Sequence, residues 1–170
     1  MKDFIAIMTG YLLITVQAVL GGVIGMEYMS PNLLLAFVLF LGAIDFGSAR
    51  GTAICFILGY LLDVSSGSPP GIHCFVIPAT YLVFRAVYAR MMFSGAIFQI
   101  LLTFLSSIAS GLIIIGIRAL FERSIFTWNV IFLMLPLSSV STAIVSPLVF
   151  KLGKVLIPES PKRKEEKVIM

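Results

Sequence analysis

The chain has 170 residues, of which 59% are hydrophobic and only 12% are charged, whereas about a quarter of the residues in a soluble domain are charged. A water-soluble fold of this length could not bury so much apolar side chain, because roughly a third of its accessible surface would still face water. The composition therefore excludes a soluble globular domain and indicates an integral membrane protein. Half of the formal net charge of +4 lies in the final residues PKRKEEKVIM, so it does not indicate a nucleic-acid partner.

Six apolar segments are predicted to form membrane-spanning helices, since about 20 helical residues cross the hydrocarbon core of a bilayer. They cover residues 4–25, 32–47, 50–64, 71–92, 95–117 and 128–151. The N-terminal run is longer than the apolar part of a signal peptide and has no clear cleavage site, so we expect it to remain as an uncleaved helix. The second and third segments are short, and AIDFGSARG between them carries the turn signal of a charge pair with two glycines.

The predicted fold is all-α, with one six-helix transmembrane domain over residues 1–157 and a short charged cytoplasmic tail over residues 158–170. The tail is interrupted by proline and carries mixed charge, so we expect it to be solvated and to bind anionic membrane lipid weakly. Cys55 and Cys74 lie in apolar segments without CxxC spacing. They are interpreted as small core residues and not as a metal site or a disulfide framework.

The orientation in the membrane follows from the distribution of Lys and Arg at the segment ends. If six helices span and both termini are cytoplasmic, the outer side carries only Arg118 and Arg123. The inner side then carries Lys2, Arg50, Arg85, Arg90, Lys151 and Lys154 before the tail. This asymmetry predicts that both termini are cytoplasmic and that the loop after residue 64 faces outward.

That outward loop belongs to GYLLDVSSGSPPGIH, residues 59–73, in which an apolar helix stops at an aspartate. At the outer interface the carboxylate of Asp63 can accept hydrogen bonds from backbone N–H groups of the loop that follows. Serine and glycine favour a tight reversal, and the two prolines stiffen the exit into the next helix. The pattern predicts a rigid outer cap in which Asp63 fixes the turn into the fourth helix.

The longer run RGTAICFILGYLLDVSSGSPPGIH resembles the signature of the rod shape-determining MreD family, in which a glycine-rich helix ends in G-x-L-x-D and continues through a Ser/Gly loop. The resemblance extends to Ser30-Pro31 before the second helix, to the chain length and to the six-span plan. The family pattern carries over to Pro31, Gly51, Gly59, Asp63 and Gly71. This chain departs from the pattern at Pro70, where an apolar residue is more frequent, and at Ser30, where a basic residue is common.

The resemblance implies a non-enzymatic scaffold subunit of the bacterial cell-elongation complex, located in the cytoplasmic (inner) membrane and involved in cell shape and peptidoglycan synthesis. The partner implied is the bitopic protein MreC, and through it MreB filaments, the glycosyltransferase RodA and a penicillin-binding transpeptidase. No cofactor is implied. The implied architecture is similar to that of the substrate-binding component of energy-coupling-factor transporters.

Two other functions remain as alternatives. A substrate-binding component of a vitamin transporter would have a similar fold, and it would be distinguished by polar and aromatic residues that converge on an outward cavity. The candidates for such a site are Asp63, His73, Trp128 and Asn129, too few to specify a vitamin. An intramembrane serine hydrolase would use Ser110 and His73, but no oxyanion motif accompanies them.

Ionisable and small residues inside the segments give further candidates. Asp45 and Arg85 could form an intramembrane ion pair, although Arg85 could instead extend to the inner headgroups. Small residues four apart allow helices to approach closely, and they are interpreted mainly as internal packing. These pairs are Ala6 with Gly10, Ala18 with Gly22, Gly21 with Gly25, and Ser107 with Gly111.

Overall fold

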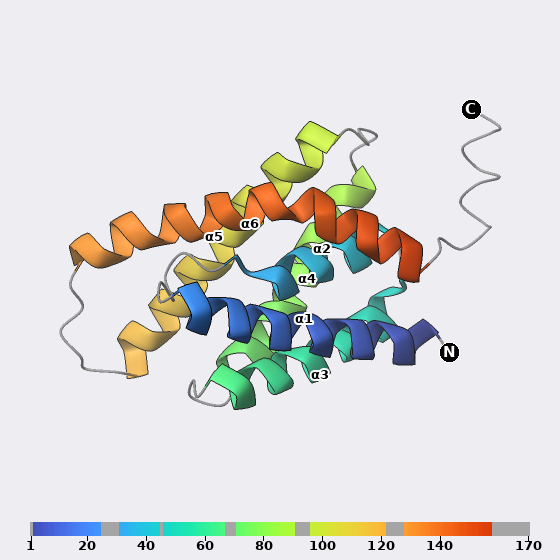
Figure 1. The fold of residues 1–170 in the computed structure, drawn as a ribbon, viewed down its shortest axis with the longest axis horizontal. Coiled ribbons are helices and arrows are strands. Elements are labelled where there is room, and N and C mark those ends of the chain that lie inside the picture. Colours follow the sequence, from blue (N-terminus) through green and yellow to red (C-terminus); the bar gives the residue numbers. More distant parts are fainter. Residues whose placement is uncertain are drawn as a thin grey trace.

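The computed structural model describes residues 2–24, 31–44, 46–66, 71–90, 96–121 and 128–157, and over these ranges the chain forms six α-helices. The helices are α1 (Lys2–Ile24), α2 (Leu33–Ala43), α3 (Ser48–Ser66), α4 (Ile72–Arg90), α5 (Ala96–Phe121) and α6 (Trp128–Leu156). Figure 1 shows one bundle, with the start of α1 and the end of α6 at the same end. The predicted tail, residues 158–170, lies outside the described residues.

Each predicted apolar segment corresponds to one helix, but the helices differ in their capacity to span a membrane. α1, α4, α5 and α6 contain segments that are long and apolar enough to cross a bilayer. α2 has 11 residues, which is about 16 Å of helix against about 30 Å of hydrocarbon. α3 has 19 residues with several polar side chains and is not one of the four candidate spans. The chain is thus a multi-pass membrane protein by length and composition, and the prediction of six full spans is not confirmed.

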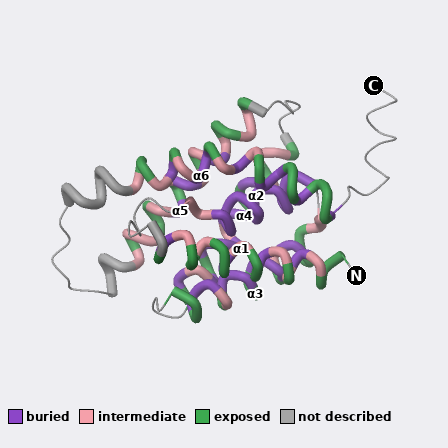
Figure 2. The backbone as a smooth tube through the Cα atoms, in the orientation of Figure 1, coloured by how far each residue is buried: buried purple, intermediate pink, exposed green. Residues whose placement is uncertain are grey.

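α2 is the centre of the bundle. All of its residues are buried, and Figure 2 shows it enclosed by the other helices. A helix that is apolar on every side has no solvent-facing stripe, so it is stable only when surrounded. Its ring contacts are internal as well, since Phe40 packs edge-on against Phe150 of α6 with ring centroids 5.7 Å apart. The short second segment is therefore a core helix, shielded from lipid by its neighbours.

The ends of α2 are set by local hydrogen bonds and by a turn. The Asn32 side chain accepts a bond from the Leu35 N–H at 2.9 Å, and the Asn32 N–H donates to the Thr142 hydroxyl at 2.9 Å. Side chains thus satisfy N–H groups at the helix start that have no acceptor within the helix. The helix ends four residues earlier than the predicted segment because the chain turns at Ile44 and reaches Gly47, whose φ of 92° favours glycine.

The small residues of α1 divide into a packed half and an open half. Ala6 is fully buried, and a Cβ at Gly10 would lie 2.6 Å from Leu58 Cδ1 of α3. A Cβ at Gly22 would meet nothing within 4 Å, and both Ala18 and Gly22 are exposed. The interpretation of Ala18 and Gly22 as a packing pair is therefore wrong, because α3 contacts α1 at the level of Gly10.

The other two small-residue pairs have different outcomes. Ser107 is buried on α5, and a Cβ at Gly111 would lie 3.3 Å from Leu135 of α6, so this pair faces the α5–α6 interface. Gly21 is buried, whereas its partner Gly25 lies outside the described residues. Small residues thus mark helix contacts at some positions and not at others, because the spacing alone does not say which face a neighbour covers.

Candidate functional site

The Asp63 carboxylate lies at the contact between α3 and α4, and its side chain is 0% exposed. Its Oδ2 atom accepts hydrogen bonds from the Gly71 N–H at 2.9 Å and from the Cys74 N–H at 3.2 Å. Its Oδ1 atom accepts from the His73 N–H at 3.1 Å. These backbone groups belong to the start of α4, where the first N–H groups have no acceptor inside the helix. Asp63 therefore caps α4 from the neighbouring helix.

The imidazole of His73 completes this arrangement. Its Nδ1 atom lies 2.7 Å from Asp63 Oδ1, and the imidazole is 14% exposed. An ionised carboxylate can only accept hydrogen bonds, so this geometry assigns the Nδ1 proton to His73. A negative charge at a helix N-terminus is also favoured by the helix dipole. Asp63 thus makes four hydrogen bonds, two at each oxygen, to the first turn of α4 and to Gly71 just before it.

Gly59 allows the two helices to come this close. It lies one turn before Asp63 on the same face of α3. A Cβ at Gly59 would lie 2.6 Å from the His73 carbonyl oxygen and 2.9 Å from the carbonyl carbon. These are backbone atoms that cannot rotate away, so a side chain here would force α3 and α4 apart. Gly71 has a φ of 108°, a left-handed conformation in which glycine is strongly preferred.

The same face of α3 continues to the other end of the helix. A Cβ at Gly51 would overlap the Tyr81 hydroxyl of α4, and that hydroxyl donates to the Gly47 carbonyl at 3.0 Å. Gly51, Cys55, Gly59 and Asp63 follow one another at intervals of four residues, and all are buried. We call this row the α3 seam.

The pattern of the α3 seam was visible in the sequence, because small residues recurred every four positions up to an aspartate. The small-residue pairs predicted from the sequence did not include the Gly51–Cys55–Gly59 repeat. The sequence did not indicate that the partner would be α4, or that His73 would contact Asp63.

Other candidates lie elsewhere. Pro31 is half-buried ahead of α2 and its carbonyl accepts from the Leu33 N–H at 3.0 Å, so it is separate from the α3 seam. Asp45 lies outside the described residues, so the predicted ion pair between Asp45 and Arg85 is untested. The Arg85 Nη1 atom donates to the Ser48 hydroxyl at 2.6 Å, which links α4 to the start of α3.

Two of the residues considered for a serine hydrolase or a vitamin-binding site, Ser110 and His73, make hydrogen bonds within the protein. The Ser110 hydroxyl donates to the Ser107 carbonyl at 3.0 Å, while His73 bonds Asp63 through Nδ1. The side chains of Trp128 and Asn129 are not among those described. The structure thus joins Asp63 and His73 into one cluster at the start of α4.

Comparison with known proteins identifies the family. The searches of curated proteins and of solved structures found no match, so the similarity to energy-coupling-factor components stays a prediction. The sequence model of the family described as "rod shape-determining protein MreD" matches residues 2–156, which is nearly the whole chain and includes the α3 seam. The chain therefore belongs to the MreD family of rod shape-determining proteins.

Proposed function

We propose that this protein is a non-enzymatic scaffold subunit of the cell-elongation complex in the bacterial inner membrane, and that it acts by binding MreC. Through MreC it would be linked to MreB, to RodA and to a penicillin-binding transpeptidase. Membership of the MreD family supports the role in rod shape. One structural observation carries the scaffold function: the buried Asp63 carboxylate is fully engaged in holding α4 against α3.

A carboxylate buried in the protein is costly unless it is paired and hydrogen-bonded, so its use indicates what the protein needs at that position. A carboxylate that itself attacked or deprotonated a substrate would keep an oxygen available to it, whereas both oxygens of Asp63 already accept two bonds each. The result is a fixed geometry of α3 and α4 at one end of the bundle. A rigid surface binds a partner more tightly, because less conformational entropy is lost on binding.

The scaffold function predicts a cellular defect and a physical association. Depletion of the protein in a rod-shaped bacterium that depends on it is expected to give round cells, and a tagged copy is expected to recover MreC from detergent-solubilised membranes. A tagged copy of an unrelated multi-pass protein provides the control. Depleted cells that remain rods, or membranes from which MreC is never recovered, would contradict the proposal.

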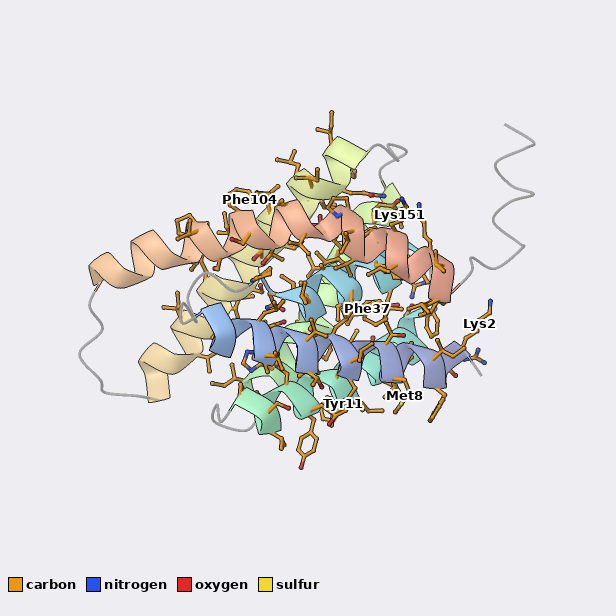
Figure 3. All side chains as sticks on the ribbon, in the orientation of Figure 1. Lys2, Met8, Tyr11, Phe37, Phe104 and Lys151 are labelled. Carbon is orange, nitrogen blue, oxygen red and sulfur yellow. The ribbon has the colours of Figure 1, made fainter. Side chains whose placement is uncertain are left out.

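We further propose that both termini face the cytoplasm. Lys2 and Lys151 point away from the bundle at the same end (Figure 3), which agrees with the excess of basic residues predicted for the inner side. Reporter fusions after Ser66 and after Lys164 are then expected to report opposite sides of the membrane. Equal cytoplasmic activity from both fusions would reject this orientation.

No observation on the described residues favours the transporter alternative. A cavity of about 370 Å³ lies between α1 and α3, and its polar side chains are Gln17, Ser65 and Ser66. The Gln17 Oε1 atom already accepts from the Leu34 N–H at 3.5 Å, and the Ser65 hydroxyl donates to the Leu61 carbonyl at 2.7 Å. Gln17 and Ser65 thus bond the protein's own backbone, so they do not define a ligand.

A further inference from the structure

The described basic side chains gather at one end of the bundle. One lies at the start of α1, one in the first turn of α3, one in the second half of α4 and two near the end of α6. Figure 3 shows those of α1 and α6 pointing away from the bundle at the same end. We call this set the basic end, and its members are Lys2, Arg50, Arg85, Lys151 and Lys154.

Contacts between α1 and α3 place the first two of these cations at one level. A Cβ at Gly10 would lie 2.6 Å from Leu58 Cδ1, so these residues face each other. The two helices run in the same direction, because the later residues of both line one cavity. Lys2 and Arg50 each lie eight residues before the Gly10–Leu58 contact, which is about 12 Å along each helix.

Contacts of α2 bring the ends of α4 and α6 to the same level. The Arg85 guanidinium donates to the Ser48 hydroxyl at the start of α3. A Cβ at Gly42, near the end of α2, would lie 3.8 Å from the Arg85 backbone nitrogen. Gly153, in the last turns of α6, packs against Phe40 of α2. The cations of α3, α4 and α6 therefore surround the end of the core helix.

The charge at the basic end is almost entirely of one sign. Asp3, in the first turn of α1, is the one carboxylate among the described residues there. Arg50, Lys151 and Lys154 are exposed, and none of them makes an ion pair or a side-chain hydrogen bond within the described part of the chain. Positive charge that lies beside apolar surface and has no nearby counter-charge attracts anions strongly.

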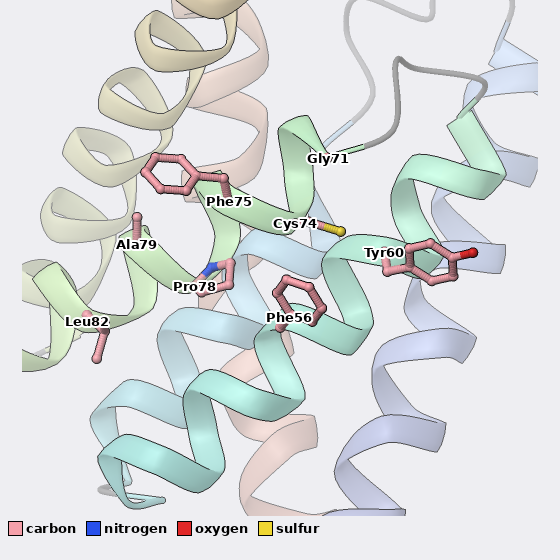
Figure 4. A pocket seen from close by; sticks show the side chains of 8 residues that line it. All are labelled: Phe56, Tyr60, Gly71, Cys74, Phe75, Pro78, Ala79 and Leu82. Atoms are coloured by element: carbon pink, nitrogen blue, oxygen red, sulfur yellow. The ribbon is translucent and has the colours of Figure 1, made fainter.

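Exposed apolar side chains lie directly beside these cations. Phe4 and Val155 are 66% and 77% exposed, next to the basic residues of α1 and α6. On the α3–α4 side, Figure 4 shows Phe56 and Leu82 at the pocket that both helices line, and both are exposed. A soluble acidic protein would match the cations but not this apolar surface. An anionic phospholipid carries a phosphate and acyl chains in one molecule, and so matches both.

We propose that the basic end binds the phosphate groups of anionic phospholipids, whose acyl chains lie along the adjacent apolar side chains. The proposal concerns which lipid molecules stay next to the protein, whereas the orientation proposed above concerns only which side of the membrane the cations occupy. It does not depend on MreC or on the scaffold function, so either can fail without the other.

The test measures the association of spin-labelled lipids with the full chain in phosphatidylcholine bilayers by electron paramagnetic resonance. Each cation near an anionic membrane surface contributes about fivefold to binding, and the measurement averages over all lipids in contact with the protein. Spin-labelled phosphatidylglycerol is therefore expected to associate at least about twofold more strongly than spin-labelled phosphatidylcholine. This preference should fall in about 1 M salt, which screens charges beyond about 3 Å.

Two triple variants separate charge from fold. Arg50→Gln with Lys151→Gln and Lys154→Gln should abolish the preference for phosphatidylglycerol, and the fold should persist because all three side chains are exposed. Arg50→Lys with Lys151→Arg and Lys154→Arg keeps the charges and should keep the preference. Equal loss of the preference in both variants would show that it does not depend on charge, and would overturn the proposal.

Three further results would overturn it. The first is equal association of the two lipids with the unsubstituted protein. The second is an undiminished preference in the glutamine variant, with its loss only when Lys162, Arg163 and Lys164 of the tail are replaced by glutamine. The third is binding of soluble polyglutamate at the basic end without any preference between the lipids, which would assign this surface to an acidic protein instead.

Discussion

Asp63→Ala is expected to lower the free energy of unfolding by about 2 to 5 kcal/mol. The substitution removes the acceptor of three backbone N–H groups and of the His73 imidazole, and it leaves these donors without their partner, the Cys74 N–H in a buried position. This loss exceeds that of an ordinary helix cap, which is about 0.5 to 2 kcal/mol, because the carboxylate is buried and joins two helices. Membrane insertion should be affected less, since it depends on the many apolar residues of the longer helices.

Thermal unfolding in detergent, compared between Asp63→Ala and the unsubstituted protein, tests this prediction. Asp3→Ala is the matched control, because Asp3 is an exposed carboxylate in the first turn of α1, and its loss should change stability little. Asp63→Asn keeps the shape but turns an NH₂ group toward N–H donors, so it should also destabilise the protein. Equal stability of Asp63→Ala and Asp3→Ala would show that the bonds at Asp63 do not hold the helices together.

Gly59→Ala is expected to destabilise the protein by about 3 kcal/mol, near the upper end of the usual overpacking range. The new Cβ would lie 2.6 Å from the His73 carbonyl oxygen, and a backbone atom cannot move without the whole helix. The helix propensity of alanine, which favours it over glycine by up to about 1 kcal/mol, offsets only part of this cost. Displacement of α4 would also lengthen the bonds to Asp63.

Gly22→Ala is the matched control, since its Cβ would meet nothing within 4 Å and the same propensity should leave stability unchanged or slightly raised. Gly59 and Asp63 both act on the contact between α3 and α4. The double substitution Gly59→Ala with Asp63→Ala should therefore lower the free energy of unfolding by less than the sum of the two single effects. Strict additivity, or a stable Gly59→Ala protein, would argue against a close approach of α3 and α4.

The sequence predicted all six helices because each apolar run is bounded by polar, glycine or proline residues. It also predicted that Asp63 would accept N–H bonds from the segment that follows it. Length alone could not show that the second segment is a core helix, because an 11-residue apolar helix has the same composition whether lipid or protein surrounds it. Only the positions of its neighbours decide between the two.

The remaining features depend on tertiary geometry. No sequence pattern indicated that His73 would point at Asp63, since two residues ten positions apart meet only when the loop between them reverses. The small residues of α1 were interpreted as one face, yet only the half near Gly10 is covered by α3. Spacing identifies residues that could lie at a contact, and the arrangement of the helices selects among them.

The central claim is that Asp63 holds the first turn of α4, and amide hydrogen exchange tests it most directly. In the unsubstituted protein the amides of Gly71, His73 and Cys74 should exchange slowly, although first-turn amides have no acceptor within their own helix. In Asp63→Ala they should exchange about tenfold faster or more, because a hydrogen bond to a charged group contributes about 1.5 to 3 kcal/mol. Amides in the middle of α5 should exchange equally in both proteins. Fast exchange of the three amides in the unsubstituted protein, at the rate found in Asp63→Ala, would contradict the account.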